Sequence, residues 1–311
     1  MPGCLVLSGA AERFAEEIAR AGDIDIAVEA CTTVAEALRR YSGQSIVFGN
    51  PDLVAAILPE LPAVDWVQST WAGVKPLCDI ARRDYVLTGV KDVFGPQISE
   101  YVMAYLLAHK LKVHERMARQ CKREWYPASS GVLHGKRLGV MGTGSIGAHV
   151  ARTGRAFGMK LTGLSRSGAP LPDFNHVEPV SRLHDFLAGL DFLVTTLPQT
   201  DSTDRLLDRA ALGKLPSHAY VINVGRGNVI DDDALVEALE SGTLAGAALD
   251  VFNEEPLPCD SRFWSAPNLT ITAHIAAISH PSLIAPVFLE NYRRFSNGEP
   301  LKFVIDLDKG Y

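Results

Sequence analysis

Apolar runs and helical patterns alternate along the first 94 residues of the chain. Two stretches, Ala11–Ala21 and Val34–Arg40, carry apolar side chains at helical spacing. The short apolar runs around them predict strands at residues 4–7, 24–28, 46–49 and 66–68. Strands that alternate with helices are typical of a parallel sheet with helices on both faces.

The longest helical pattern spans Phe94–Lys112, and a second series of strands follows it. This helix suits a connection between two domains, and a chain of 311 residues is expected to form two. The later apolar runs predict strands at 138–141, 160–164, 192–196, 220–224, 245–251 and 269–272. We therefore predict an α/β fold of two doubly wound parallel-sheet domains, Rossmann-like or flavodoxin-like, with a cleft between them.

A glycine fingerprint follows the first strand of the second series. The run 136–147, KRLGVMGTGSIG, contains the spacing G-x-G-x-x-G, and a helix is predicted after it over Ala148–Met159. In that setting Gly142 permits a tight turn, Gly144 lets the backbone approach a pyrophosphate, and Gly147 lets the helix pack closely. The N-terminus of that helix supplies free N–H groups and a positive dipole end for phosphates. The alternative is an ordinary Gly-rich turn, but the flanking strand and helix favour a dinucleotide site.

The end of the next strand bears on the choice of cofactor. An acidic residue there would hold the ribose hydroxyls of NAD, but this chain has Ser165, Arg166 and Ser167. Without a carboxylate a 2′-phosphate is not repelled, and an arginine can bind it through charge-assisted hydrogen bonds. We therefore predict NADP(H) in preference to NAD(H), which remains possible. The alternative is that Arg166 is a surface residue and the ribose is held otherwise.

Composition narrows the class of protein. Hydrophobic residues make up 47% and charged residues 21%, which is ordinary for a soluble globular protein. The net charge is −6 with no basic block, which argues against nucleic acid as a partner. The five cysteines are scattered without a C-x-x-C pair, so we expect reduced thiols in a cytoplasmic protein. No signal peptide or membrane-length apolar run is recognised, and we expect neither a membrane nor a metal as partner.

Three residues suited to catalysis follow three successive predicted strands. Arg226 lies in the run Gly225-Arg226-Gly227, Glu255 in an acidic loop, and His274 directly after the strand 269–272. Strand ends of one parallel sheet meet along one edge, so these side chains should share a crevice. Individually each could be structural, because Arg226 could pair with Asp231 and Glu255 could only shape its loop.

Jointly the three residues suit the reduction of a 2-oxo acid by a nicotinamide. Negative charge grows on the carbonyl oxygen as hydride arrives, and a histidine such as His274 can deliver the proton. A neighbouring carboxylate such as Glu255 favours the imidazolium and fixes the ring. Arg226 keeps its charge and can anchor a carboxylate or polarise the carbonyl.

Four motifs resemble the signatures of the D-isomer-specific 2-hydroxyacid dehydrogenases, in particular their glyoxylate/hydroxypyruvate reductase branch. They are GTGSIG at 142–147, NVGRGNVIDDDAL at 223–235, LDVFNEEPLP at 249–258 and NLTITAHIAA at 268–277. The tail 290–311 also looks like that branch, so the resemblance covers nearly the whole chain.

The resemblance implies a substrate domain of residues 1–94 plus 282–311 and a dinucleotide-binding domain of residues 95–281. It implies Arg226 on the substrate, His274 as acid/base with Glu255 as partner, and a homodimer joined through the nucleotide domains. The sequence of the loop after the strand 66–68 alone favours a plain turn. The resemblance implies that its residues Trp71, Ala72 and Gly73 bind the substrate. Cofactor contacts are implied for Gly144, Ser145, Ile146, Leu197, Pro198, Val224 and Asp250, beside the fingerprint residues Gly142 and Gly147 and the neighbouring Gly225.

The chain departs from the family pattern at three positions. Ala273 stands where a proline commonly precedes the histidine, and Lys75 stands where aspartate is frequent. Trp71 is bulky for the substrate loop, which suggests that the substrates are small. We expect an NADPH-dependent reductase of glyoxylate, hydroxypyruvate or a similar short acid. The rivals are a dehydrogenase of another small acid, such as formate or phosphite, and a nucleotide-sensing binding or co-repressor protein of the same fold.

Overall fold

The computed structural model describes residues 3–22 and 24–309, which divide into two compact units. One unit contains the chain up to Val93 together with the chain from Ser279 onward, and the other is Phe94–Ile278. Each unit is built around its own parallel sheet, so the predicted α/β class with two parallel sheets is confirmed.

The first unit has a five-stranded sheet in the order β2-β1-β3-β4-β5, with every pair parallel. This is the flavodoxin-like strand order, with helices on the connections. The strands are β1 (Cys4–Leu7), β2 (Val28–Cys31), β3 (Ile46–Gly49), β4 (Trp66–Ser69) and β5 (Val86–Thr88). The helices are α1 (Ala11–Arg20), α2 (Val34–Arg40), α3 (Pro51–Ile57), α4 (Lys75–Asp79) and α11 (Pro281–Ser296), with a 3-10 turn at Leu58–Glu60.

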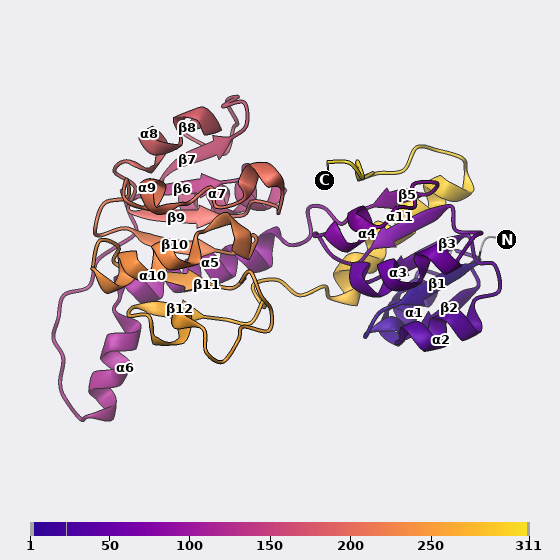
Figure 1. Cartoon of the computed structure of the whole chain (residues 1–311), viewed down its shortest axis with the longest axis horizontal. Helices are drawn as coiled ribbons and strands as arrows, with labels where there is room; N and C mark the ends of the chain where they lie inside the picture. The colour runs from indigo at the N-terminus through magenta and orange to yellow at the C-terminus, as the bar shows by residue number, and fades with distance from the viewer. Residues whose placement is uncertain (1–2, 23, 310–311) are drawn as a thin grey trace. The chain divides into compact units, whose positions relative to one another are not determined.

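The C-terminal helix α11 completes the core of this unit. The ring of Phe288 stacks on Phe48 of β3 with centroids 4.5 Å apart, and on Trp66 of β4 at 5.4 Å. Nearby, Asn291 Nδ2 donates to Gln68 Oε1 over 3.1 Å, inside the same buried face. The last helix of the chain thus covers strands formed by its first 70 residues (Figure 1).

The second unit has a seven-stranded sheet in the order β12-β11-β10-β9-β6-β7-β8, again with every pair parallel. Its strands are β6 (Arg137–Met141), β7 (Lys160–Ser165), β8 (His176–Pro179), β9 (Phe192–Thr195), β10 (Tyr220–Asn223), β11 (Gly246–Leu249) and β12 (Leu269–Ile271). Its helices are α5 (Gly95–Lys110), α6 (Val113–Cys121), α7 (Ser145–Ala156), α8 (Leu183–Leu187), α9 (Arg209–Leu212) and α10 (Asp232–Glu240). Single 3-10 turns lie at Val180–Arg182, Asp201–Thr203, Gly227–Val229 and Arg262–Ser265.

Several predicted bounds differ from the structure by one or two residues, and three elements differ by more. The strand expected at 24–28 is β2 at Val28–Cys31, because its sheet neighbour β1 begins at Cys4 and pairs Cys4 with Val28. The helix expected over Ala148–Met159 is α7, which begins directly after Gly144 and ends before the left-handed turn at Gly158. The single helix expected over Phe94–Lys112 breaks at Lys112, whose backbone is left-handed (φ 55°), and a new helix, α6, follows.

Helix α6 and the segment after it form an arm, residues 112–131, that extends away from the sheet of its own unit (Figure 1). Helix α6 has no buried residue. The arm is closed at its base, where Gly131 N donates to Lys110 O over 3.0 Å. Within it, the Arg116 guanidinium donates to Tyr126 O (3.0 Å) and Ser130 Oγ (2.9 Å). The arm is therefore an ordered, exposed structure rather than part of a core.

Within the described residues, no helix is both long and apolar enough to cross a membrane.

Candidate active site

The glycine turn lies at the point where the strand order of the second unit reverses. The chain runs from β6 outward to β7 and β8, and then returns to β9 on the other side of β6. Ligands of doubly wound sheets bind beyond the carboxyl ends of the strands at such a point. Gly142 follows β6 there with φ 93°, a conformation that favours glycine.

Each fingerprint glycine has a distinct structural reason. A Cβ on Gly147 would lie 1.9 Å from the carbonyl oxygen of Gly142, so only glycine lets α7 approach the turn. A Cβ on Gly142 would lie 2.8 Å from Thr196 Oγ1 at the end of β9. A Cβ on the exposed Gly144 would meet nothing within 4 Å, which leaves space beside its backbone.

The N-terminus of α7 offers free donors in that space. The N–H groups of Gly144, Ser145 and Ile146 donate to no residue in the described part of the chain. Unsatisfied N–H groups and the positive end of the helix dipole favour an anion. These residues therefore fit the pyrophosphate of a dinucleotide.

The predicted ribose-side residues form a tight turn at the end of β7. Ser165 Oγ accepts from Gly168 N over 3.0 Å, and Gly168 is left-handed with φ 69°. Arg166 and Ser167 are exposed on this turn. No carboxylate stands at the strand end, which keeps the turn compatible with a phosphate group.

The remaining predicted cofactor residues follow β9, β10 and β11 along the same edge. Leu197 is half-buried, Pro198 is exposed, and Val224 is buried directly after β10. A Cβ on Gly225 would lie 2.6 Å from Leu197 O, so the segments after β9 and β10 approach closely because Gly225 has no side chain.

His274 and Glu255 are in direct contact. His274 Nδ1 lies 2.7 Å from Glu255 Oε2, and both side chains are partly exposed to solvent. The other carboxylate oxygen, Oε1, accepts from Phe252 N over 2.8 Å. The carboxylate is thus oriented by the backbone and in turn orients the imidazole. Because Nδ1 faces Glu255, the ring nitrogen left for other partners is Nε2.

Arg226 is held on the loop after β10 in the same unit. Asn223 fixes that loop, since its Nδ2 donates to Arg226 O (2.9 Å) and its Oδ1 accepts from Gly225 N (3.0 Å). Burial lowers the pKa of Arg226, and the negative charge of Glu255 offsets part of this effect. A half-buried guanidinium within the field of Glu255 is an anion-binding group shielded from water.

Asp250 anchors the loop that presents His274. Its buried carboxylate accepts from Thr272 Oγ1 (2.6 Å) and Ile275 N (2.8 Å) through Oδ1, and from Ala276 N (2.8 Å) through Oδ2. The Asp250 carbonyl accepts from His274 N over 2.8 Å. His274 itself is left-handed (φ 54°), and these bonds hold it in that sparsely populated conformation. The predicted contact of Asp250 with the nicotinamide stays a prediction.

Sequence reasoning missed the support that Asn223, Thr272 and Tyr101 give to this site. The Tyr101 hydroxyl, on α5, lies 2.7 Å from Thr272 Oγ1, which extends the Asp250 network to a helix about 170 residues away in sequence. Asn223 lies close to the run Gly225-Arg226-Gly227 in the sequence. That position alone does not reveal that both the nitrogen and the oxygen of its side-chain amide bind the loop.

Trp71, Ala72 and Gly73 belong to the first unit, after the carboxyl end of β4. Trp71 N donates to Ser69 Oγ over 2.9 Å, whereas the N–H groups of Ala72 and Gly73 donate to none of the described residues. Two adjacent free N–H groups fit a carboxylate or another small anion. Lys75, for which the sequence offered no role, pairs with Asp79 one helical turn later.

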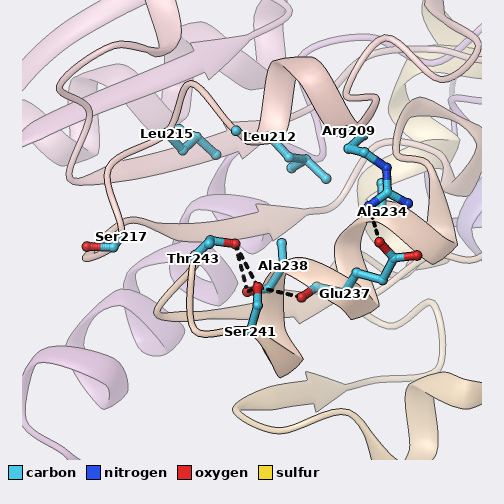
Figure 2. A pocket seen from close by; sticks show the side chains of 10 residues that line it. Arg209, Leu212, Leu215, Ser217, Ala234, Glu237, Ala238, Ser241 and Thr243 are labelled. Carbon is cyan, nitrogen blue, oxygen red and sulfur yellow. Dashed lines mark hydrogen bonds and ion pairs between the residues drawn. The ribbon is translucent and has the colours of Figure 1, made fainter.

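A hollow of about 530 Å³ lies elsewhere in the second unit (Figure 2). Its wall is formed by α9, α10 and the segments before β10 and β11, which is the amino edge of the sheet. Arg209 pairs with Glu237 across it, and the hydroxyls of Ser241 and Thr243 bond to each other and to backbone carbonyls. The hollow is therefore separate from the site at the carboxyl edge of the sheet, and these polar groups already have partners within the protein.

Comparison with known proteins identifies similar chains. The family described as "D-isomer specific 2-hydroxyacid dehydrogenase, NAD binding domain" matches residues 103–276, more than half of the chain. A curated relative, glyoxylate/hydroxypyruvate reductase A of Klebsiella pneumoniae (strain 342), is 33% identical over 217 residues, 70% of each chain.

Two solved structures resemble the whole chain. A D-isomer specific 2-hydroxyacid dehydrogenase family protein from Aeromonas salmonicida subsp. salmonicida A449 has a TM-score of 0.94 and 38% identity over 99% of each chain. An NADPH-dependent glyoxylate/hydroxypyruvate reductase from Sinorhizobium meliloti, in complex with NADP and sulfate, has a TM-score of 0.88 and 31% identity over 100% of each chain.

Proposed function

Because this chain belongs to the D-isomer specific 2-hydroxyacid dehydrogenase family and is an oxidoreductase with an NAD(P)-binding domain, we propose that it reduces small 2-oxo acids with NADPH. Glyoxylate and hydroxypyruvate are the substrates we expect. The observation that carries the proposal is the contact between His274 and Glu255 beside the half-buried Arg226. All three residues lie in the unit that also contains the glycine turn.

In the proposed reaction His274 delivers a proton from Nε2 to the substrate's carbonyl oxygen, while a bound reduced nicotinamide would supply the hydride. Glu255 keeps the ring oriented through Nδ1 and stabilises its positive charge before the transfer. Arg226 binds the carboxylate and oxo group and stabilises the charge that develops on oxygen. The free N–H groups of Ala72 and Gly73 hold the substrate carboxylate, and Trp71 restricts the size of the substrate.

We assign the nucleotide to the unit Phe94–Ile278, near the predicted bounds of 95–281, and the substrate loop to the other unit. Gly144, Ser145 and Ile146 would hold the pyrophosphate, and Ser165, Arg166 and Ser167 the 2′-phosphate. Leu197, Pro198, Val224, Gly225 and Asp250 would lie toward the nicotinamide end, along the strand edge that follows the switch point.

The substrate proposal is tested by mixing the purified protein with NADPH and a panel of 2-oxo acids that includes glyoxylate, hydroxypyruvate and pyruvate. The loss of NADPH absorbance should be fastest with glyoxylate and hydroxypyruvate. Formate and phosphite, tested with NADP and NAD, serve as substrates of rival dehydrogenases. NADPH binding without turnover of any of these acids would contradict the proposal and favour a nucleotide-sensing protein.

The cofactor preference is tested with Arg166→Asp. The new carboxylate repels a 2′-phosphate and can accept from the ribose hydroxyls of NADH, so the ratio of kcat/KM for NADPH over NADH should fall by roughly 100-fold. Arg39→Asp makes the same charge change on the exposed face of α2 and should leave the ratio unchanged. Steady-state kinetics with both cofactors measure the ratio, and an unaltered ratio in Arg166→Asp contradicts the assignment.

We further propose that the protein acts as a homodimer, with the arm 112–131 of the second unit as the contact surface. The side chain of Trp125 is 94% exposed, and Met117 on α6 is 59% exposed, which are large apolar groups to leave in water. Residues 112–124 carry five basic and two acidic side chains, whereas the whole chain has a net charge of −6. A second copy of the chain, whose net charge is negative, is therefore a partner that a basic, apolar arm would attract.

A further inference from the structure

The segment 272–279, here called the connector, carries His274 and leads from the second unit to the first. Asp250 binds the backbone of Ile275 and Ala276, as described above. Gln97 of α5 then clamps Ile278, because its Oε1 accepts from Ile278 N (2.9 Å) and its Nε2 donates to Ile278 O (3.1 Å). The connector is therefore held by side chains up to its last residue in the second unit.

The next residue, Ser279, is bound within the first unit. Its hydroxyl donates to the carbonyl oxygen of Thr70 over 2.7 Å. Thr70 is fully buried and fixed on its other sides, since its N–H donates to Gly49 O (3.0 Å) and its Oγ1 donates to Asn50 Oδ1 (2.8 Å). The contact thus joins the end of the connector to the residue directly before Trp71.

The peptide between Thr70 and Trp71 is pinned from both sides. Ser279 Oγ donates to its carbonyl oxygen, and Ser69 Oγ accepts from its N–H, contributed by Trp71, over 2.9 Å. Because a peptide is planar and trans, fixing both groups fixes the plane and the direction in which the chain continues. The next two N–H groups are those of Ala72 and Gly73, which have no partner among the described residues.

We propose that Ser279 is a positioning residue for the reduction. Its hydrogen bond to Thr70 orients the 70–71 peptide so that the N–H groups of Ala72 and Gly73 stay turned toward the carboxylate of the 2-oxo acid. Ser279, Thr70 and the loop after β4 all lie in the first unit, so this orientation is set within that unit. This inference rests on the proposed function.

Ser279→Ala removes the donor, Ser279→Thr keeps it, and Ser282→Ala is the matched control. Ser282 is exposed one residue into α11, and its side chain bonds to none of the described residues. With NADPH saturating, Ser279→Ala should raise KM for glyoxylate by roughly 10-fold, the usual consequence of losing one oriented hydrogen bond. The KM for glyoxylate of Ser279→Thr and of Ser282→Ala should stay within about 2-fold of the parent value. The Kd of NADPH should be unchanged in all three variants.

An unchanged KM in Ser279→Ala overturns the proposal, and so does an equal loss of NADPH affinity, which indicates general damage to the fold. Amide hydrogen exchange of residues 69–74 without any ligand tests the same contact independently of turnover. Exchange should be several-fold faster in Ser279→Ala than in Ser282→Ala, because the 70–71 peptide is released; equal exchange overturns the proposal. If the parent protein reduces no 2-oxo acid, the proposed function has failed, whereas normal turnover with no effect of Ser279→Ala refutes this inference alone.

Discussion

Among single residues, His274 combines the features expected of a proton donor. Its Nδ1 is occupied by Glu255, its side chain remains partly exposed, and its left-handed backbone is held by Asp250. Holding a non-glycine residue in this backbone conformation costs free energy, and the surrounding hydrogen bonds must offset that cost. Such an arrangement is more typical of a functional histidine than of a surface histidine.

The first prediction at this scale concerns His274→Ala. Without the imidazole the carbonyl oxygen has no positioned proton donor, so kcat for glyoxylate reduction should fall by on the order of 100-fold or more. Glu255→Gln keeps the size of the side chain but removes the charge, and should lower kcat by a smaller factor. His184→Ala, on the exposed face of α8, is the matched control and should match the parent protein. A loss of only a few-fold in His274→Ala would reassign the proton donor.

At the scale of elements, the turn between β6 and α7 combines two different needs for glycine. Gly147 is required by packing, because its Cβ position is filled by the carbonyl of Gly142, whereas Gly144 has open space around it. The first requirement concerns the protein's own fold, whereas the open space at Gly144 leaves room for the pyrophosphate that we propose there. Substitution with alanine should separate the two.

Gly147→Ala should displace α7 from the turn and destabilise the protein by about 1–3 kcal/mol, the usual cost of overpacking. Gly144→Ala should leave stability nearly unchanged, since its backbone is extended with φ −68° and nothing opposes a Cβ. It should still weaken NADPH binding by about 10-fold or more, because the methyl group obstructs the approach of the pyrophosphate. Urea unfolding and fluorescence titration with NADPH measure the two effects; a stable Gly147→Ala or an unaffected Kd in Gly144→Ala contradicts them.

Elements that depend on local sequence were predictable, and those that depend on distant partners were not. The apolar runs at Cys4–Leu7 and Ile46–Gly49 give β1 and β3 with the predicted bounds, because their four residues are buried on both faces. The run 24–28, which contains Asp25, was also predicted as a strand, yet pairing with β1 begins only at Val28. Short elements without a clear pattern, such as β5 and β8, were not predicted at all.

The candidate site shows the same division. The spacing of glycines and the strand-end positions of Arg226, Glu255 and His274 can be read directly from the sequence. The contacts of Asp250 with Thr272 and Ala276 cannot, because they span more than 20 residues and need the register of β11 and β12. The hydrogen bond from Ser279 to Thr70 joins residues 209 positions apart and requires the fold of the whole first unit.

At the scale of the whole molecule, the exposed arm 112–131 is the feature that a single chain does not explain. It holds its shape through its own hydrogen bonds, and it presents Trp125 and Met117 to solvent. A second copy of the chain would remove that surface from water, and burial of a Trp side chain at an interface often contributes more than 2 kcal/mol to association.

The parent protein should therefore be dimeric, and Trp125→Glu should shift it toward monomer at micromolar concentration. Trp264→Glu serves as the control, because Trp264 is 56% exposed on a different part of the same unit and should leave the dimer intact. Light scattering after size-exclusion chromatography measures both masses. A monomeric parent protein, or a Trp125→Glu variant that stays dimeric, contradicts the proposed interface.

The place of α11 in the first unit has a consequence for biosynthesis. Phe48 and Trp66 emerge early from the ribosome, but the ring that stacks on both of them belongs to Phe288 and is translated much later. At ordinary elongation rates the gap lasts on the order of 10–40 s, because the contiguous stretch Phe94–Ile278 is synthesised before α11. During that interval the nascent first unit exposes an aromatic surface, and a chaperone that shields such surfaces should determine how much of the chain reaches its native state.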